Sequence, residues 1–132
     1  MKFLPHSLWY LLLAAILGAT GCVSPNTISP AEPDQHIVMA KQFFWLKNLR
    51  SELITESDGT ASVVLQGTSS SMQKHQLYIR TNWFKANGMP IESRLSGWER
   101  IPFLSNMPFY YTKAAPSSDA ADYRILITDS LN

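Results

Sequence analysis

The chain of 132 residues contains a single cysteine, Cys22. One thiol cannot form an intramolecular disulfide or a cysteine-based metal site, so stability must come from the burial of a core. Concentrated charge is lacking too, because 11 Lys and Arg oppose 10 Asp and Glu and the basic residues do not cluster. Nucleic-acid binding needs a concentrated positive face. We therefore expect no nucleic acid among the partners.

A long hydrophobic run is also absent. The uncharged stretch from Leu8 to Leu17 is too short to span about 30 Å of hydrocarbon, which takes roughly 20 apolar residues. It follows Lys2 and ends in Leu17-Gly18-Ala19-Thr20-Gly21-Cys22. Small residues before a cysteine are typical of a bacterial lipoprotein signal. A plain secretory signal or an uncleaved anchor helix are the alternatives, and the cysteine at the cleavage site favours lipidation.

These features predict three segments. Residues 1–21 form a cleaved lipoprotein signal peptide, and residues 22–35 hold the lipidated Cys22 and a proline-rich tether. Residues 36–132 provide one folded domain. Two or more acyl chains anchor a protein stably, so membrane lipid attached through Cys22 is an expected partner. Val23, where an Asp would favour the inner membrane, indicates the periplasmic side of the outer membrane.

The aromatic block Phe43-Phe44-Trp45-Leu46 allows more than one interpretation. Apolar residues recur at helical spacing around it, which fits a short amphipathic helix, and a buried strand fits almost as well. Flanking Lys41, Lys47 and Arg50 would also suit a block that rests in the lipid interface. Core packing is the simpler interpretation.

From Leu53 onward the pattern is that of short strands. Residues 77–84 alternate between two faces with a period of two. Ser57-Asp58-Gly59 predicts a turn, Asn87-Gly88 supplies the positive dihedrals of a tight hairpin, and Gly67 to Ser71 indicates a flexible run. Further strands are expected over 53–55, 62–66, 98–103, 109–113 and 123–128. The fold class is therefore all-β, an antiparallel β-sandwich.

Three segments in the second half of the chain resemble the YcfL-type family of small bacterial lipoproteins. They are Tyr78-Ile79-Arg80-Thr81-Asn82-Trp83-Phe84-Lys85-Ala86-Asn87-Gly88, then Ser96-Gly97-Trp98-Glu99-Arg100-Ile101, and Ala115-Pro116 leading into Tyr123-Arg124-Ile125. The chain departs from the family at Thr81, where an aromatic is usual, and at Lys85, where an acidic residue is usual. The resemblance implies an immunoglobulin-like sandwich on a lipid tether. The family has no established activity, so it supplies no catalytic residues.

Catalytic motifs are weak in the rest of the chain. His36 and His75 stand alone in the sequence, without the spacing or carboxylate company of a zinc site. Ser71-Met72-Gln73-Lys74 matches S-x-x-K, but the S-D-N and K-T-G partner motifs are missing. We therefore expect no catalytic residue, no metal and no cofactor.

The candidate interaction surface consists of Tyr78, Arg80, Phe84 and Trp98. The first three project from one side of a predicted strand, which the N-terminal segment covers or a partner contacts. We expect a non-enzymatic, lipid-anchored binding or accessory module with an envelope protein as partner. The alternative is a structural subunit of an envelope secretion or conjugation machine.

The lipid anchor gives the first testable prediction. Cys22→Ser removes the acceptor thiol and should leave an unprocessed precursor or a soluble species, as measured by intact mass and membrane fractionation. A cleaved but unmodified cysteine, with normal membrane retention of the original chain, would contradict lipidation.

Overall fold

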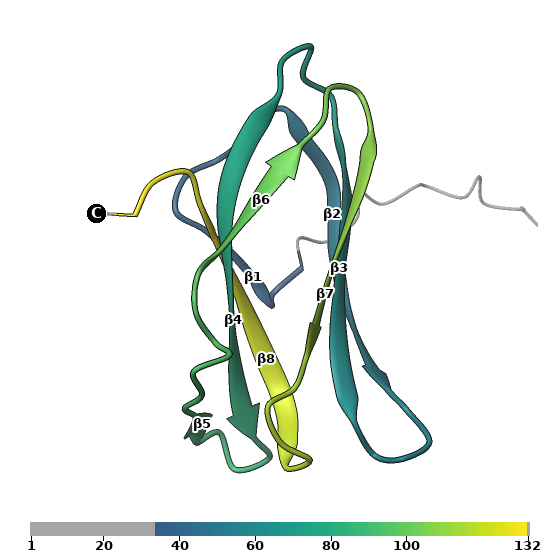
Figure 1. The fold of residues 1–132 in the computed structure, drawn as a ribbon, viewed down its shortest axis with the longest axis vertical. Helices are drawn as coiled ribbons and strands as arrows, with labels where there is room; N and C mark the ends of the chain where they lie inside the picture. Colours follow the sequence, from purple (N-terminus) through teal and green to yellow (C-terminus); the bar gives the residue numbers. More distant parts are fainter. Residues whose placement is uncertain (1–33, 132) are drawn as a thin grey trace, which may run out of the picture. The chain divides into compact units, whose positions relative to one another are not determined.

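The computed structural model describes residues 34–131, which form eight β-strands in two sheets (Figure 1). The predicted signal peptide, Cys22 and the tether up to residue 33 lie outside this range. Within it, no helix has the length and apolar character needed to cross a membrane.

The larger sheet is built around β4 (His75–Lys85). On one side β4 pairs with β8 (Ala120–Thr128), and β1 (Ile37–Met39) extends the sheet by pairing with β8. On the other side the start of β4 pairs with β6 (Glu99–Phe103) and its end pairs with β5 (Pro90–Ile91). β4 is therefore bonded along both edges and is the central strand of this sheet.

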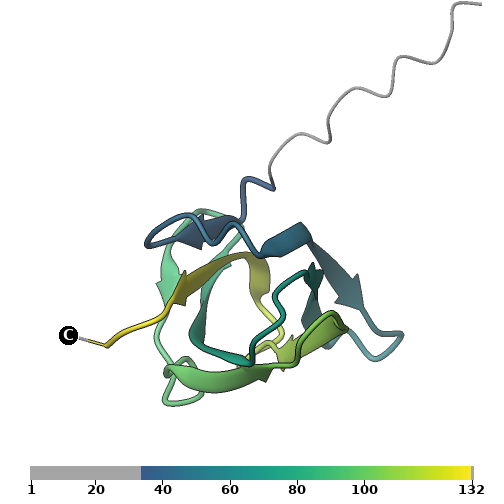
Figure 2. The ribbon, with the colours of Figure 1, turned by 90° about the horizontal axis from the view of Figure 1, so that it is seen from above.

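The smaller sheet has the order β2 (Leu46–Thr55), β3 (Ala61–Ser69) and β7 (Pro108–Ala114). Seen from above, the strands of the two sheets surround a common interior (Figure 2). The predicted all-β fold is confirmed. Every strand pair is antiparallel except β1 with β8, which is parallel.

The core lies between the two sheets. Along β3 and β4 every second residue is buried, as a strand with one face on the core requires. Val63 and Leu65 from β3 face the larger sheet and are wholly inaccessible to solvent. Ile79 from β4 and Ile125 from β8 are equally inaccessible, and Trp83 is 1% exposed. This alternation confirms the two-faced strand predicted over residues 77–84.

The aromatic block at residues 43–46 is a turn that leads into a strand. The Leu46 backbone N–H donates to the Phe43 carbonyl at 3.0 Å, and β2 begins at Leu46. Phe43 and Leu46 are buried, whereas Phe44 is 74% exposed. Asn48 has a φ of +54°, and the β2–β3 register shifts between Lys47 and Arg50, so a β-bulge follows the turn. The helix interpretation is wrong because this turn and bulge break the helical spacing.

The flexible run predicted from Gly67 to Ser71 is wrong for its first three residues, which belong to β3. Gly67 lies directly across from Phe109 of β7. A Cβ at residue 67 would lie 2.8 Å from Cε1 of Phe109. The glycine is therefore needed for close packing, since the Phe109 ring occupies the place of the missing side chain and contacts Phe103 edge-on at 4.5 Å.

The two tight turns share one geometry. In each, a backbone N–H donates three residues back, from Gly59 to Glu56 and from Gly88 to Lys85. Both glycines have positive φ, +85° and +82°. Asn87 is not among the positive-φ residues, so the hairpin uses a three-residue loop in place of the predicted turn with two positive dihedrals. The Asn87 side chain instead accepts a hydrogen bond from the Met89 N–H at 3.1 Å.

Gly88→Val should lower the free energy of unfolding by about 1–3 kcal/mol, because a β-branched residue strongly disfavours positive φ. A Cβ at residue 88 meets nothing within 4 Å, so the cost is one of backbone conformation. Gly97 has equal room and no positive φ, which makes Gly97→Val the matched control. Equal denaturant midpoints for the two variants would contradict the turn assignment.

Candidate functional site

The outer face of β4 carries the predicted interaction residues. Because Leu77, Ile79, Thr81 and Trp83 point into the core, the alternate residues project to the opposite face of the sheet. These are Tyr78, Arg80, Asn82 and Phe84, all half-buried. The structure thus places three of the four predicted residues on one face, with Trp98 immediately before β6 and 38% exposed.

A cavity of about 600 Å³ adjoins this face. Its walls come from the end of β4, from β5 and from the connection that leads to β6. The lining residues are Arg80, Asn82, Trp83, Phe84, Pro90, Ile91, Glu92, Ser93, Arg94 and Ser96. Tyr78 and Trp98 are not among them. Within residues 34–131, the β5–β6 connection therefore flanks the outer face of β4. β1 does not cover this face, because it extends the same sheet beyond β8.

Three polar atoms of the lining residues are buried without a protein hydrogen-bond partner in the described part of the chain. They are Nε of Arg80, Nε1 of Trp83 and Oγ of Ser96, and Trp83 and Ser96 are only 1% and 8% exposed. A buried donor left unpaired costs about 1–3 kcal/mol. Within residues 34–131, the hydrogen-bonding capacity of these three atoms is therefore left unused.

Arginine is concentrated on the same face. Arg100 of β6 stands opposite Tyr78, and Arg124 of β8 stands opposite Asn82, so both share the outer face with Arg80. Arg94 projects from the β5–β6 connection. Between residues 34 and 131, every ion pair is made by Lys or His and none by an arginine. The face therefore has positive charge that these residues do not neutralise by ion pairing.

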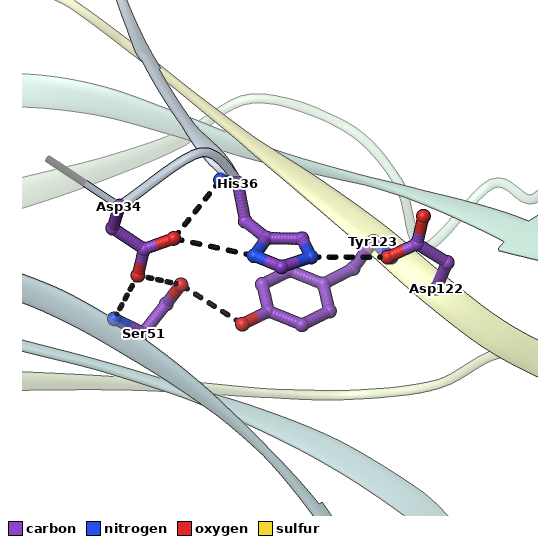
Figure 3. A network of polar contacts seen from close by, with 5 residues as sticks. All are labelled: Asp34, His36, Ser51, Asp122 and Tyr123. Carbon is purple, nitrogen blue, oxygen red and sulfur yellow. Dashed lines mark hydrogen bonds and ion pairs between the residues drawn. The ribbon is translucent and has the colours of Figure 1, made fainter. Parts of the chain in front are cut away.

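A second polar arrangement lies where the described chain begins (Figure 3). The Asp34 carboxylate accepts bonds from the backbone N–H and the hydroxyl of Ser51, at 2.6 and 2.5 Å. It also accepts from the His36 backbone N–H at 2.9 Å and contacts His36 Nδ1 at 3.2 Å. Asp34 thereby ties the segment before β1 to β2 of the other sheet.

Tyr123 of β8 completes this network. Its hydroxyl donates to Ser51 Oγ at 2.9 Å, and its ring stacks on His36 with centroids 4.5 Å apart (Figure 3). The second ring nitrogen of His36, Nε2, lies 3.2 Å from Asp122. His36 stands alone in the sequence, but in the structure it contacts two carboxylates. Sequence reasoning missed this network because 17 residues separate Ser51 from Asp34 and 72 separate it from Tyr123.

The network contains the Ser, His and Asp of a catalytic triad, but the hydrogen bonds connect them in a different order. A nucleophilic serine needs a base that accepts its proton, whereas here His36 and Ser51 both bond to Asp34 and not to each other. Burial raises the pKa of Asp34, but hydrogen bonds from Ser51 and His36 outweigh it, so the pKa lies below its usual value. Asp34 contacts Nδ1 of His36, and Asp122 contacts Nε2 on the opposite side of the ring. Within residues 34–131, no group of three or more His, Cys, Asp or Glu side chains is placed to hold a metal ion.

His75 also has side-chain partners in the structure. Its ring stacks on Trp45 at 4.1 Å, and its Nε2 lies 2.7 Å from Ser71 Oγ. The segment from Ser71 to Lys74 is a bend rather than a helix, so it does not hold the two residues one helical turn apart as S-x-x-K chemistry requires. Ser71 Oγ also accepts the Gln73 N–H at 3.1 Å, which makes these bonds part of the loop structure.

Polar contacts also join β7 of the smaller sheet to β4 and β6 of the larger sheet. Tyr111 of β7 reaches Thr81 of β4 at 3.4 Å and donates to Glu99 of β6 at 3.3 Å. Glu99 in turn pairs with Lys113. Burial, together with the Glu99 charge, raises the pKa of Tyr111 to about 12. A neutral tyrosine hydroxyl therefore links the two sheets here.

The fold is similar to those of two solved bacterial proteins. A crystal structure of cj0090 from Campylobacter jejuni matches with a TM-score of 0.61 and 13% identity, over 72% of this chain and 98% of that one. A DUF1425 family member from Shewanella sp. pv-4 matches with a TM-score of 0.56 and 16% identity, over 62% and 75% of the two chains. DUF1425 corresponds to the YcfL-like lipoproteins, so the similarity suggested by the sequence extends to the fold. No family model and no curated protein matches the sequence.

Asp34→Asn should lower the free energy of unfolding by about 1–3 kcal/mol, because it removes a charged acceptor with bonds to both Ser51 and His36. The folded-state pKa of Asp34 lies below the usual value of 3.8. The stabilisation is thus fully present above that pH and is lost as pH falls through the folded-state pKa. The melting temperatures of the two proteins should therefore differ fully at pH 7 and draw closer as the pH is lowered below 3.8.

Asp58→Asn is the matched control for this prediction. Asp58 bonds only to Thr60 in an exposed turn, and Asn87 holds the same place in the other turn. Its melting temperature should equal that of the original protein. Equal losses from the two substitutions would contradict a special role for Asp34.

Proposed function

We propose that this protein is a lipid-anchored, non-enzymatic binding or accessory module on the periplasmic side of the outer membrane. The signal-like segment ending at Cys22 and the proline-rich residues after it support the anchor. The YcfL-type sequence features and the fold similarity to a DUF1425 family member support membership of that lipoprotein family. We further assign the two-sheet domain to the immunoglobulin-like class, because two sheets pack face to face over one core.

The outer face of β4 is the observation that carries this proposal. It combines the aromatic ring of Phe84 with the guanidinium of Arg80 at the edge of a cavity. Aromatic and arginine side chains dominate the binding energy of many protein interfaces. The proposed partner is an envelope protein that contacts this face.

A photo-crosslinking amino acid tests the proposal in intact cells. Replacing Trp98 or Phe84 with an aromatic benzophenone residue should give a specific adduct with an envelope protein. Tyr110 of β7 is 71% exposed and belongs to the other sheet, so the same replacement there is the matched control. A melting temperature close to that of the original protein establishes that each variant folds.

The pattern of adducts decides the outcome. An adduct from residues 84 or 98 that is absent from residue 110 supports a partner on the outer face. Equal adducts from all three positions, or none from the outer face, would contradict it. Migration of the adduct in a megadalton assembly would instead favour a structural subunit of an envelope machine.

A further inference from the structure

We infer that the cavity beside Arg80 binds a small organic oxyanion, a molecule that carries a carboxylate or a phosphate group. The inference goes beyond the proposed function, because it assigns a small-molecule site to the same face of β4. It identifies the chemistry that the face recognises.

The guanidinium of Arg80 points to this chemistry. Arg80 lines the cavity and its Nε has no protein partner within residues 34–131, and Ser96 Oγ of the β5–β6 connection has none there either. Ser96 is more than nine-tenths buried. A guanidinium presents its donors as a rigid fork that matches the two oxygens of a carboxylate or phosphate. We expect an oxyanion in the cavity to bind the guanidinium of Arg80.

The charge around the cavity favours an anion. Arg94 joins Arg80 in the lining, and Arg124 shares the outer face through its position opposite Asn82. Glu92 is the one carboxylate of the lining, and no ion pair in the described range joins it to Arg80 or Arg94. Arginines left without carboxylate partners retain their charge for a ligand.

The remaining walls indicate that the anion is attached to a carbon skeleton. Phe84, Pro90 and Ile91 provide apolar surface next to the arginines. Ligand sites in proteins are usually apolar cavities of roughly 300–1,000 Å³ with a few placed polar groups, a range that includes the present one. A bare inorganic ion would leave these apolar walls unused.

Calorimetric titration of the purified full-length protein in detergent tests the inference. Citrate serves as the carboxylate probe and glycerol 3-phosphate as the phosphate probe, with sodium chloride at matched ionic strength as the reference. We expect at least one probe to bind saturably and to raise the melting temperature above that in sodium chloride. The better probe identifies the preferred oxyanion.

Arg80→Gln should weaken binding of that probe at least tenfold. Arg50→Gln is the matched control, because Arg50 is exposed on β2 of the other sheet and its loss changes the net charge equally; we expect less than a twofold effect. Arg94→Gln alters an exposed residue of the lining and should also weaken binding, which keeps the test valid if Arg80→Gln unfolds.

Failure of both probes to exceed sodium chloride would overturn the inference. Equal weakening by Arg50→Gln and Arg94→Gln would do the same, since it would indicate attraction by net charge alone. Neither result affects the proposed protein partner, which the photo-crosslinks test separately.

Discussion

The period-two alternation of β4 is the constraint on which the rest of the structure depends. This strand pairs along both edges, and its inner residues fill the core from Leu77 to Trp83. Once these side chains are committed to the core, the pleat sends Arg80 and Phe84 to the other face. A shift of one residue would bury the Arg80 guanidinium and expose Trp83, so the core fixes the register. The same packing that stabilises the domain therefore also positions its candidate binding residues.

Two tyrosines link the sheets in a domain whose described residues contain no cysteine. Tyr123 reaches across from β8 to Ser51 of β2, and Tyr111 reaches from β7 to Thr81 of β4. In both residues burial raises the pKa of the hydroxyl, so each stays neutral and can donate. The ring of each tyrosine belongs to the core while its hydroxyl satisfies a polar group at the rim. Polar contacts at both edges thus supplement apolar burial, which by itself does not fix how two sheets align.

The elements that could be predicted correctly from the sequence are those whose pattern lies within a few neighbouring residues. Alternation over residues 77–84 and the Asn87-Gly88 pair are visible in a short window, and the strand and turn were found there. The aromatic block was ambiguous because its conformation depends on a bulge at Asn48, which periodicity does not reveal. The run from Gly67 was misjudged because small residues indicate flexibility in isolation, whereas here Phe109, more than 40 positions away, packs on the glycine. The cavity and the Asp34 network escaped prediction for the same reason, since each joins segments that are distant in the sequence.

Lysine and histidine form the ion pairs of the described residues, whereas the arginines form none, and this difference supports the proposed binding role of the arginines. In the described range, carboxylates pair with Lys41, Lys85, Lys113 and His36, while the arginines remain outside ion pairs. A lysine is a flexible point charge, which suffices to neutralise an exposed carboxylate, whereas arginine offers a planar fork suited to recognition. Surface ion pairs add little to stability, so the pairing by lysine is not what holds the domain together. Arg80 is different because its Nε is buried without a protein partner, a state that packing alone does not favour. An anion that binds the Arg80 guanidinium from the cavity would offset this local cost.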